Sequence, residues 1–136
     1  MDQMDEAIKN GTAVFVFGSN LAGIHGAGAA RHAEEHWGAK RGVGVGLTGM
    51  AYGIPTKNHN INKMSLKQIK PQVDELKLFA THMPSITFKV TQIGCGLAGY
   101  KPEDIAPMFE DSPKNCWFDH AWYQWLGADY HYWGSL

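Results

Sequence analysis

The segment from Val14 to Ala33 carries the residues with the clearest chemical potential in the chain. It begins within an apolar run, Ala13–Phe17, which is typical of a strand buried on both faces, and glycine then recurs at positions 18, 23, 26 and 28. Small alanines and an arginine follow, at positions that favour a helix. A strand, a glycine-rich loop and a helix N-terminus, in this order, present backbone N–H groups and the positive end of the helix dipole to an anion. The segment therefore predicts a phosphate-binding loop, and the alternative is a tight turn that binds nothing.

A second glycine-rich loop, Gly94-Cys-Gly-Leu-Ala-Gly99, has the same setting. It follows a β-branched, alternating run at Ile86–Ile93 that predicts a strand, and it precedes a helix that should begin near Pro102 and continue to Phe109. Ligands of open α/β sheets bind beyond the carboxyl ends of the strands. Two such loops on one edge would form a bipartite anion site, which suits a diphosphate.

The remaining chain supplies elements that could position these loops. Alternating strands and helices predict an α/β layer fold with much parallel sheet, in a single domain of 136 residues. The chain should begin with a polar lead-in at 1–12 that contains about one turn of helix. Further helices are expected at 28–37, from the N-cap Ser65 to about His82, and at 119–126. Strands are expected at 51–55 and 115–118.

The charge balance excludes two broad classes of partner. Twelve Lys and Arg against thirteen Asp and Glu give a net charge of −1, so we expect neither a non-specific nucleic-acid sheath nor a polybasic membrane patch. No segment has the length and apolar character of a transmembrane span, and the acidic N-terminus is unlike a signal peptide. Two cysteines, Cys95 and Cys116, make a poor disulfide framework, so a cytoplasmic location is expected.

Two short motifs suggest other chemistry and are weaker. Gly44-Val-Gly-Leu-Thr-Gly49 fits a dinucleotide fingerprint, but no clear strand precedes it and a strand rather than a helix follows. His32-Ala-Glu-Glu-His36 fits an inverted zinc-hydrolase pattern, with both histidines on one helical face. No third zinc ligand is indicated, so we expect neither metal nor cofactor, and a zinc hydrolase is the less favoured alternative.

The last twenty residues hold eight of the sixteen aromatic side chains. Residues 119–136 form an aromatic-rich extension, which includes Trp122, Trp125, Tyr130 and Trp133, and Trp117 lies just before it. The favoured interpretation is that these rings pack a helix onto the sheet, and the alternative is a stacking wall for a purine or a dimer contact.

Three motifs together resemble the macrodomain family, which binds ADP-ribose. They are Gly26-Ala-Gly-Ala-Ala30, the strand ending Ile54-Pro-Thr-Lys57, and Val90-Thr-Gln-Ile-Gly-Cys-Gly-Leu97, and their order and spacing agree over residues 13–118. The chain is most similar to the branch of terminal ADP-ribose protein glycohydrolase and the bacterial DNA ADP-ribosyl glycohydrolases. The resemblance implies a three-layer α/β/α fold with a mixed, largely parallel sheet. It also implies ADP-ribose, or ADP-ribosylated protein or nucleic acid, as the partner.

The resemblance also assigns roles to individual residues. It places Asn20 near the reacting sugar and maps the catalytic lysine of the branch onto Lys57. The residues expected to surround the diphosphate and the distal ribose are Gly18, Ser19, Asn20, Gly26, Ala27, Gly28, Gly94, Cys95, Gly96, Leu97, Ala98 and Gly99.

The chain departs from that branch in two places. The branch has an aspartate after Gly-Cys-Gly-Leu that helps to resolve the sugar–enzyme intermediate, whereas this chain has Ala98, and Asp104 in the next helix is the candidate substitute. Macrodomains also begin with a strand ending in Gly-Asp, whose aspartate contacts adenine. Nothing similar precedes Ala13, and the aromatic extension is the candidate replacement. Two functions follow from the resemblance: hydrolysis of ADP-ribosyl linkages, or binding of the nucleotide without turnover.

Overall fold

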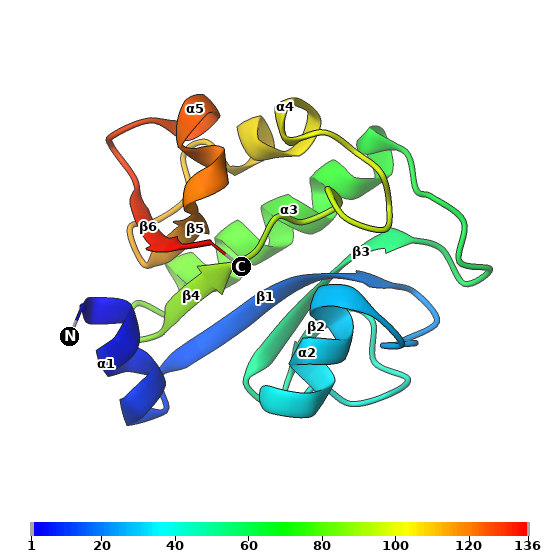
Figure 1. The fold of residues 1–136 in the computed structure, drawn as a ribbon, viewed down its shortest axis with the longest axis horizontal. Helices are drawn as coiled ribbons and strands as arrows, with labels where there is room; N and C mark the ends of the chain where they lie inside the picture. Colours follow the sequence, from blue (N-terminus) through cyan, green and yellow to red (C-terminus); the bar gives the residue numbers. More distant parts are fainter. Residues whose placement is uncertain (1, 136) are drawn as a thin grey trace.

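The computed structural model describes residues 2–135, and strand β1 (Ala13–Asn20) lies inside its six-stranded sheet. The strand order is β2-β3-β1-β4-β5-β6 (Figure 1). The other strands are β2 (Gly46–Thr48), β3 (Ala51–Lys57), β4 (Thr87–Val90), β5 (Cys116–Asp119) and β6 (His131–Gly134). Strands β3, β1, β4, β5 and β6 are parallel, and β2 pairs antiparallel with β3. The carboxyl ends of five strands therefore meet at one edge of the sheet.

Helices cover both faces of this sheet, so the predicted three-layer α/β/α fold with a mixed, largely parallel sheet is confirmed. On one side in Figure 1 lie α3 (Leu66–Thr81), α4 (Pro102–Ile105) and α5 (Tyr123–Leu126), with the short 3₁₀ helices η1 (Ala106–Phe109) and η2 (His120–Trp122) beside them. On the other side lie α1 (Gln3–Asn10) and α2 (Gly28–His36).

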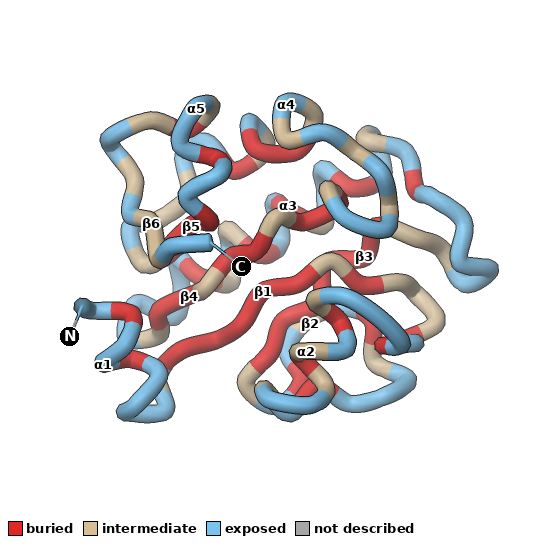
Figure 2. The backbone as a smooth tube through the Cα atoms, viewed as in Figure 1, coloured by how far each residue is buried: buried red, intermediate tan, exposed pale blue. Residues whose placement is uncertain are grey.

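The side chains of β1 explain why the layers form. Successive residues of a strand point to opposite faces, and Val14 and Val16 belong to the core under α3, whereas Phe15 and Phe17 pack under α2. Almost the whole strand is therefore buried (Figure 2). The unbroken apolar run that predicted a central strand arises from this two-sided burial.

The long helix α3 begins and ends as its sequence predicted. Ser65 is its N-cap, in a capping box with Gln68, and His82 is its C-cap. The stripe of Ile69, Val73, Leu76 and Ala80 is buried against the sheet, and Pro71 lies inside the helix without ending it.

Several elements differ from the expectations. The helices expected at 102–109 and 119–126 are each a four-residue α-helix joined to a 3₁₀ helix, and the strand expected at 86–93 is limited to Thr87–Val90. Residues 3–10 form a helix of eight residues, longer than the expected single turn, because Asp2 caps it and Met4 and Ala7 are buried against the sheet. Strand β2 was not expected, because only three residues pair. Strand β6 was also not expected, because it forms by pairing with β5, from which a short helical segment separates it in sequence.

Gly44, Gly49 and Gly53 have a packing role, because a Cβ at each would lie too close to backbone. A Cβ at Gly44 would lie 1.8 Å from the carbonyl oxygen of Asn20, and one at Gly53 would lie 2.6 Å from the carbonyl oxygen of Gly44. This loop thus passes so close to β1 and β3 that side chains are excluded. The dinucleotide fingerprint at 44–49 contains β2 and leads into β3 and not into a helix, as its sequence context indicated.

No helix among residues 2–135 combines the length and the apolar character needed to span a membrane.

Candidate functional site

A cleft of about 630 Å³ lies at the carboxyl ends of β1, β3, β4 and β5. Both glycine-rich loops border it, as do the ends of the strands that precede them. Of the twelve residues expected around a ligand, eleven line the cleft, and Gly99 is the exception. Lys57 lines it too. The structure thus brings together segments that are far apart in the chain, from Gly18 to Asp119.

The first loop connects the end of β1 to the N-terminus of α2. The side-chain amide of Asn20 accepts the N–H of Ile24 at 3.0 Å and donates to the carbonyl of Ile24 at 2.8 Å, so it braces the loop from within. This amide therefore orders the loop, and both of its polar atoms are already engaged.

The N-terminus of α2 faces the cleft without a side-chain cap. Ala27 occupies the N-cap position, the first turn holds no acidic residue, and Gly28, Ala29 and Ala30 line the cleft. The first N–H groups of a helix have no partner within the helix. These donors and the helix dipole favour a bound anion.

The second loop approaches β1 closely. A Cβ at Gly18 would lie 3.3 Å from the backbone nitrogen of Gly94, so glycine at position 18 lets the loop come near the strand. In the described chain, the N–H groups of Gly96, Leu97 and Ala98 donate to no protein acceptor. Together with the N-terminus of α2, they give the cleft two sets of free backbone donors.

Two glycines that border the cleft, Gly26 and Gly96, differ from those that pack the fold. A Cβ at Gly26 or Gly96 would meet nothing within 4 Å, whereas one at Gly44 would collide with backbone. The surfaces of both loops are therefore open at the cleft, as an approaching phosphate would require.

Lys57 ends β3 at the edge of the cleft, but the expected acid is not beside it. Ala98 lines the cleft at the position where the resemblance puts an aspartate. Asp104 is outside the cleft lining, and its carboxylate accepts the N–H of Lys101 at 3.1 Å at the start of α4. Asp104 is therefore a capping residue of that helix and does not replace the missing acid.

Asp119 is the carboxylate that lines the cleft in the described structure, and it is not among the site residues expected from the sequence. It ends β5, is 1 % exposed, and accepts hydrogen bonds from Gln92, Ala121 and Ser135. Gln92 and Thr91, after β4, also line the cleft. A polar residue directly after the expected apolar strand at 115–118 is the available signal, but the sequence pattern places Asp119 at the start of the expected helix at 119–126.

Three apolar side chains form the rim of the cleft. Ile24, Ile61 and Leu97 line it from three different loops while remaining exposed. Such groups can contact the faces of sugar or base rings, which apolar surface covers well.

Cys95 contributes a thiol to the cleft lining. Burial raises the pKa of this thiol to about 11, and the group donates to the carbonyl of Ile93. It is therefore protonated at neutral pH and is a poor nucleophile.

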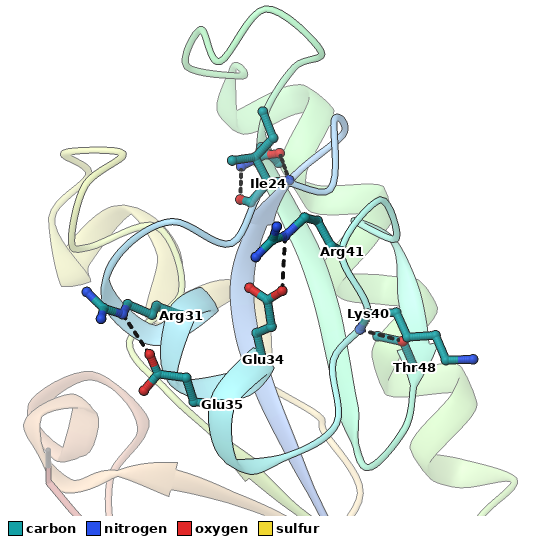
Figure 3. Close-up of polar contacts among 8 residues, drawn as sticks. Ile24, Arg31, Glu34, Glu35, Lys40, Arg41 and Thr48 are labelled. Carbon is teal, nitrogen blue, oxygen red and sulfur yellow. Dashed lines mark hydrogen bonds and ion pairs between the residues drawn. The ribbon is translucent and has the colours of Figure 1, made fainter.

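The histidine motif on α2 is occupied by other contacts. His32 packs its ring against Phe15 and is 4.7 Å from the ring of His36 between centroids. The two intervening acids pair with arginines, Glu34 with Arg41 and Glu35 with Arg31 (Figure 3). Residues 2–135 contain no group of three or more His, Cys, Asp and Glu side chains placed to hold a metal ion.

The aromatic extension packs onto the sheet. Trp122 is fully buried against Phe109 and Phe118, so the packing interpretation is confirmed for this ring. No aromatic side chain of the described residues lines the cleft, so the extension does not supply a stacking wall there.

Comparisons of the chain with models of protein families, with curated proteins and with solved structures find no match.

Proposed function

We propose that the cleft binds ADP-ribose or a related ADP-ribosyl nucleotide. The observation that carries the proposal is that, within residues 2–135, two sets of backbone N–H groups without a protein acceptor border one cleft. One set is at the uncapped N-terminus of α2, and the other belongs to residues 96–98. Two neighbouring sets of backbone donors suit two linked phosphates. The macrodomain resemblance of the same loops supports an ADP-ribosyl group as the nucleotide.

The binding test substitutes a loop glycine that tolerates a side chain. Gly96→Glu adds a carboxylate where no neighbour lies within 4 Å, so the fold should be retained while the phosphate meets a negative charge. Gly96→Gln is the matched neutral control. By calorimetry, ADP-ribose should bind the wild type with a Kd in the micromolar range and should bind Gly96→Glu much more weakly than Gly96→Gln. Absence of heat with the wild type for ADP-ribose, ADP-ribose 1″-phosphate and NAD would refute the proposal.

Hydrolysis of an ADP-ribosyl linkage is the second candidate function, and the position of Lys57 in the cleft lining favours it. The neutral amine would attack the anomeric carbon, displace the linked group, which takes up a proton, and give a Schiff base after ring opening. Water then releases the sugar. Without a carboxylate at position 98 this release should be slow, so we expect weak turnover and an adduct that borohydride traps.

Mass spectrometry after borohydride treatment tests this step with ADP-ribosylated protein and ADP-ribosylated DNA. Lys57→Ala should lose both adduct and turnover, and Ala98→Asp should raise turnover. Full hydrolysis by Lys57→Ala would exclude the lysine mechanism. Tight binding with neither cleavage nor adduct would identify a binding module without enzymatic activity.

A further inference from the structure

A buried carboxylate and an amide stand side by side in the cleft, away from the lysine. Asp119 Oδ1 accepts from the backbone N–H of Ala121 at 2.9 Å and from the hydroxyl of Ser135 at 2.6 Å. Its Oδ2 accepts from Gln92 Nε2 at 3.2 Å. The carboxylate forms no salt bridge within residues 2–135. A carboxylate offers about four acceptor sites, so one remains for a ligand.

The sheet is irregular at Asp119 in a way that suits a binding role. The pairing of β5 with β6 shifts register between Phe118 and Asp119, and the pairing of β1 with β3 shifts between Ser19 and Asn20. Such irregularities re-aim side chains and are frequent beside functional sites. Both lie at the sheet edge that forms the cleft.

The cleft has two chemically different ends. Lys57 ends β3 and Asp119 ends β5, and the order β3-β1-β4-β5 separates these strands by three spacings, or roughly 14 Å. The free N–H groups of both loops stand beside the two strands in between. An extended ligand with a central diphosphate would therefore place one terminal group near Lys57 and the other near Asp119.

We propose that Asp119 and Gln92 select adenine at this second end of the cleft, an inference that rests on the proposed function. Gln92 Nε2 has two hydrogens and donates one to Asp119, so the pair presents an acceptor next to a donor. Adenine presents the complementary edge, with the 6-amino donor beside a ring-nitrogen acceptor. The carboxylate accepts from the amino group, and the glutamine amide donates to the ring nitrogen.

Strand β6 and the residue after it help to position Asp119 and Gln92. Trp133 Nε1 donates to the carbonyl of Val90 at 2.9 Å, so β6 is tied to the end of β4 next to Gln92. Ser135, one residue beyond β6, holds Oδ1 of Asp119. The extension thus orients the carboxylate that contacts the base, although its own rings do not line the cleft.

The experiment compares ADP-ribose with its hypoxanthine analogue, in which a 6-oxo group replaces the amino group and N1 carries a hydrogen. The wild type should bind ADP-ribose roughly tenfold to a hundredfold more tightly in calorimetry. Asp119→Asn offers an amide hydrogen to the oxo group and should lose or reverse this preference. Asp104→Asn removes a carboxylate outside the cleft, so this control variant should keep the preference for ADP-ribose. Where Asp119→Asn fails to give a wild-type melting curve, Gln92→Met supplies the second test and should narrow the preference.

Equal affinity of the wild type for both nucleotides would overturn the inference while leaving the proposed function intact. Retention of the full preference by a folded Asp119→Asn would also overturn it. An ADP-ribose analogue without the adenosine 2′-hydroxyl should bind the wild type almost as well. If it binds much more weakly and Asp119→Asn removes that difference, the carboxylate contacts ribose and not adenine. Binding of neither nucleotide would refute the proposed function itself.

Discussion

Ile61 is held in a backbone conformation that β-branched residues avoid, and replacing it should separate stability from binding. Its φ is +62°, in the left-handed region. Asn58 maintains this geometry: its side-chain oxygen accepts the N–H groups of Asn60 and Asn62, and its carbonyl accepts the N–H of Ile61 at 3.0 Å. The left-handed conformation costs an L-residue about 1–2 kcal/mol, whereas asparagine tolerates it better.

The expected stability change follows from two opposing terms. Ile61 is 40 % exposed, so Ile61→Asn loses contacts of the covered part of the side chain, about 1 kcal/mol. Relief of the backbone strain offsets this loss, and the free energy of unfolding should stay within about 0.5 kcal/mol of the wild type. Ile24→Asn is the matched control, because Ile24 also lines the cleft, is 54 % exposed and has no positive φ. This control should lose about 1 kcal/mol, since nothing offsets the lost contacts.

Urea unfolding and thermal melts measure the difference, and about 1 kcal/mol between the two variants corresponds to roughly 4 °C in Tm. In calorimetry, both variants should bind ADP-ribose more weakly than the wild type, because each removes an apolar side chain from the rim. Equal destabilisation by Ile61→Asn and Ile24→Asn would show that no strain is relieved and refute the reasoning.

Other perturbations test the fold and the cleft. Met4→Ala should lower the free energy of unfolding by about 2–4 kcal/mol, because the side chain is buried under α1; a loss below about 0.5 kcal/mol in urea titration would mean that the helix does not dock. Gly44→Ala should lose several kcal/mol by collision with backbone, whereas Gly26→Ala, with open space around its Cβ, should melt near the wild type; similar melting curves would contradict the division into packing and cleft glycines. Burial raises the pKa of Cys95 from 9.0 to about 11, so iodoacetamide at pH 8 should label this thiol about a hundredfold more slowly than a free cysteine. The labelling rate, measured by mass spectrometry, should rise with pH until about pH 11. A labelling rate that levels off below pH 9 would contradict the raised pKa.

Local sequence patterns predicted the elements whose formation depends on neighbours in the chain. The apolar run of β1, the N-cap Ser65 before α3 and the glycine after each loop-forming strand act over a few residues, so they can be recognised in one sequence. Both glycine loops were also found in this way, because a strand followed by glycines and a helix start is itself a local pattern.

Elements that depend on distant partners were missed or misassigned. Helix α1 has few apolar residues, and it is longer than expected because Met4 and Ala7 meet Trp117 from the far end of the chain. Strand β6 exists by pairing with β5, and its aromatic residues alone suit a helix surface equally well. Burial and pairing partners of this kind are not encoded in short-range spacing.

The sequence by itself therefore determined the α/β class, the two glycine loops and the lysine that ends β3, since each arises from residues adjacent in the chain. The tertiary structure alone decided which other side chains share the cleft with these loops and this lysine. It brought Asp119, at the end of β5, into the same cleft as Lys57 and the two glycine loops, and it left Asp104 outside the cleft lining. Parallel pairing causes this division, because it collects the carboxyl ends of strands distant in sequence at one edge of the sheet.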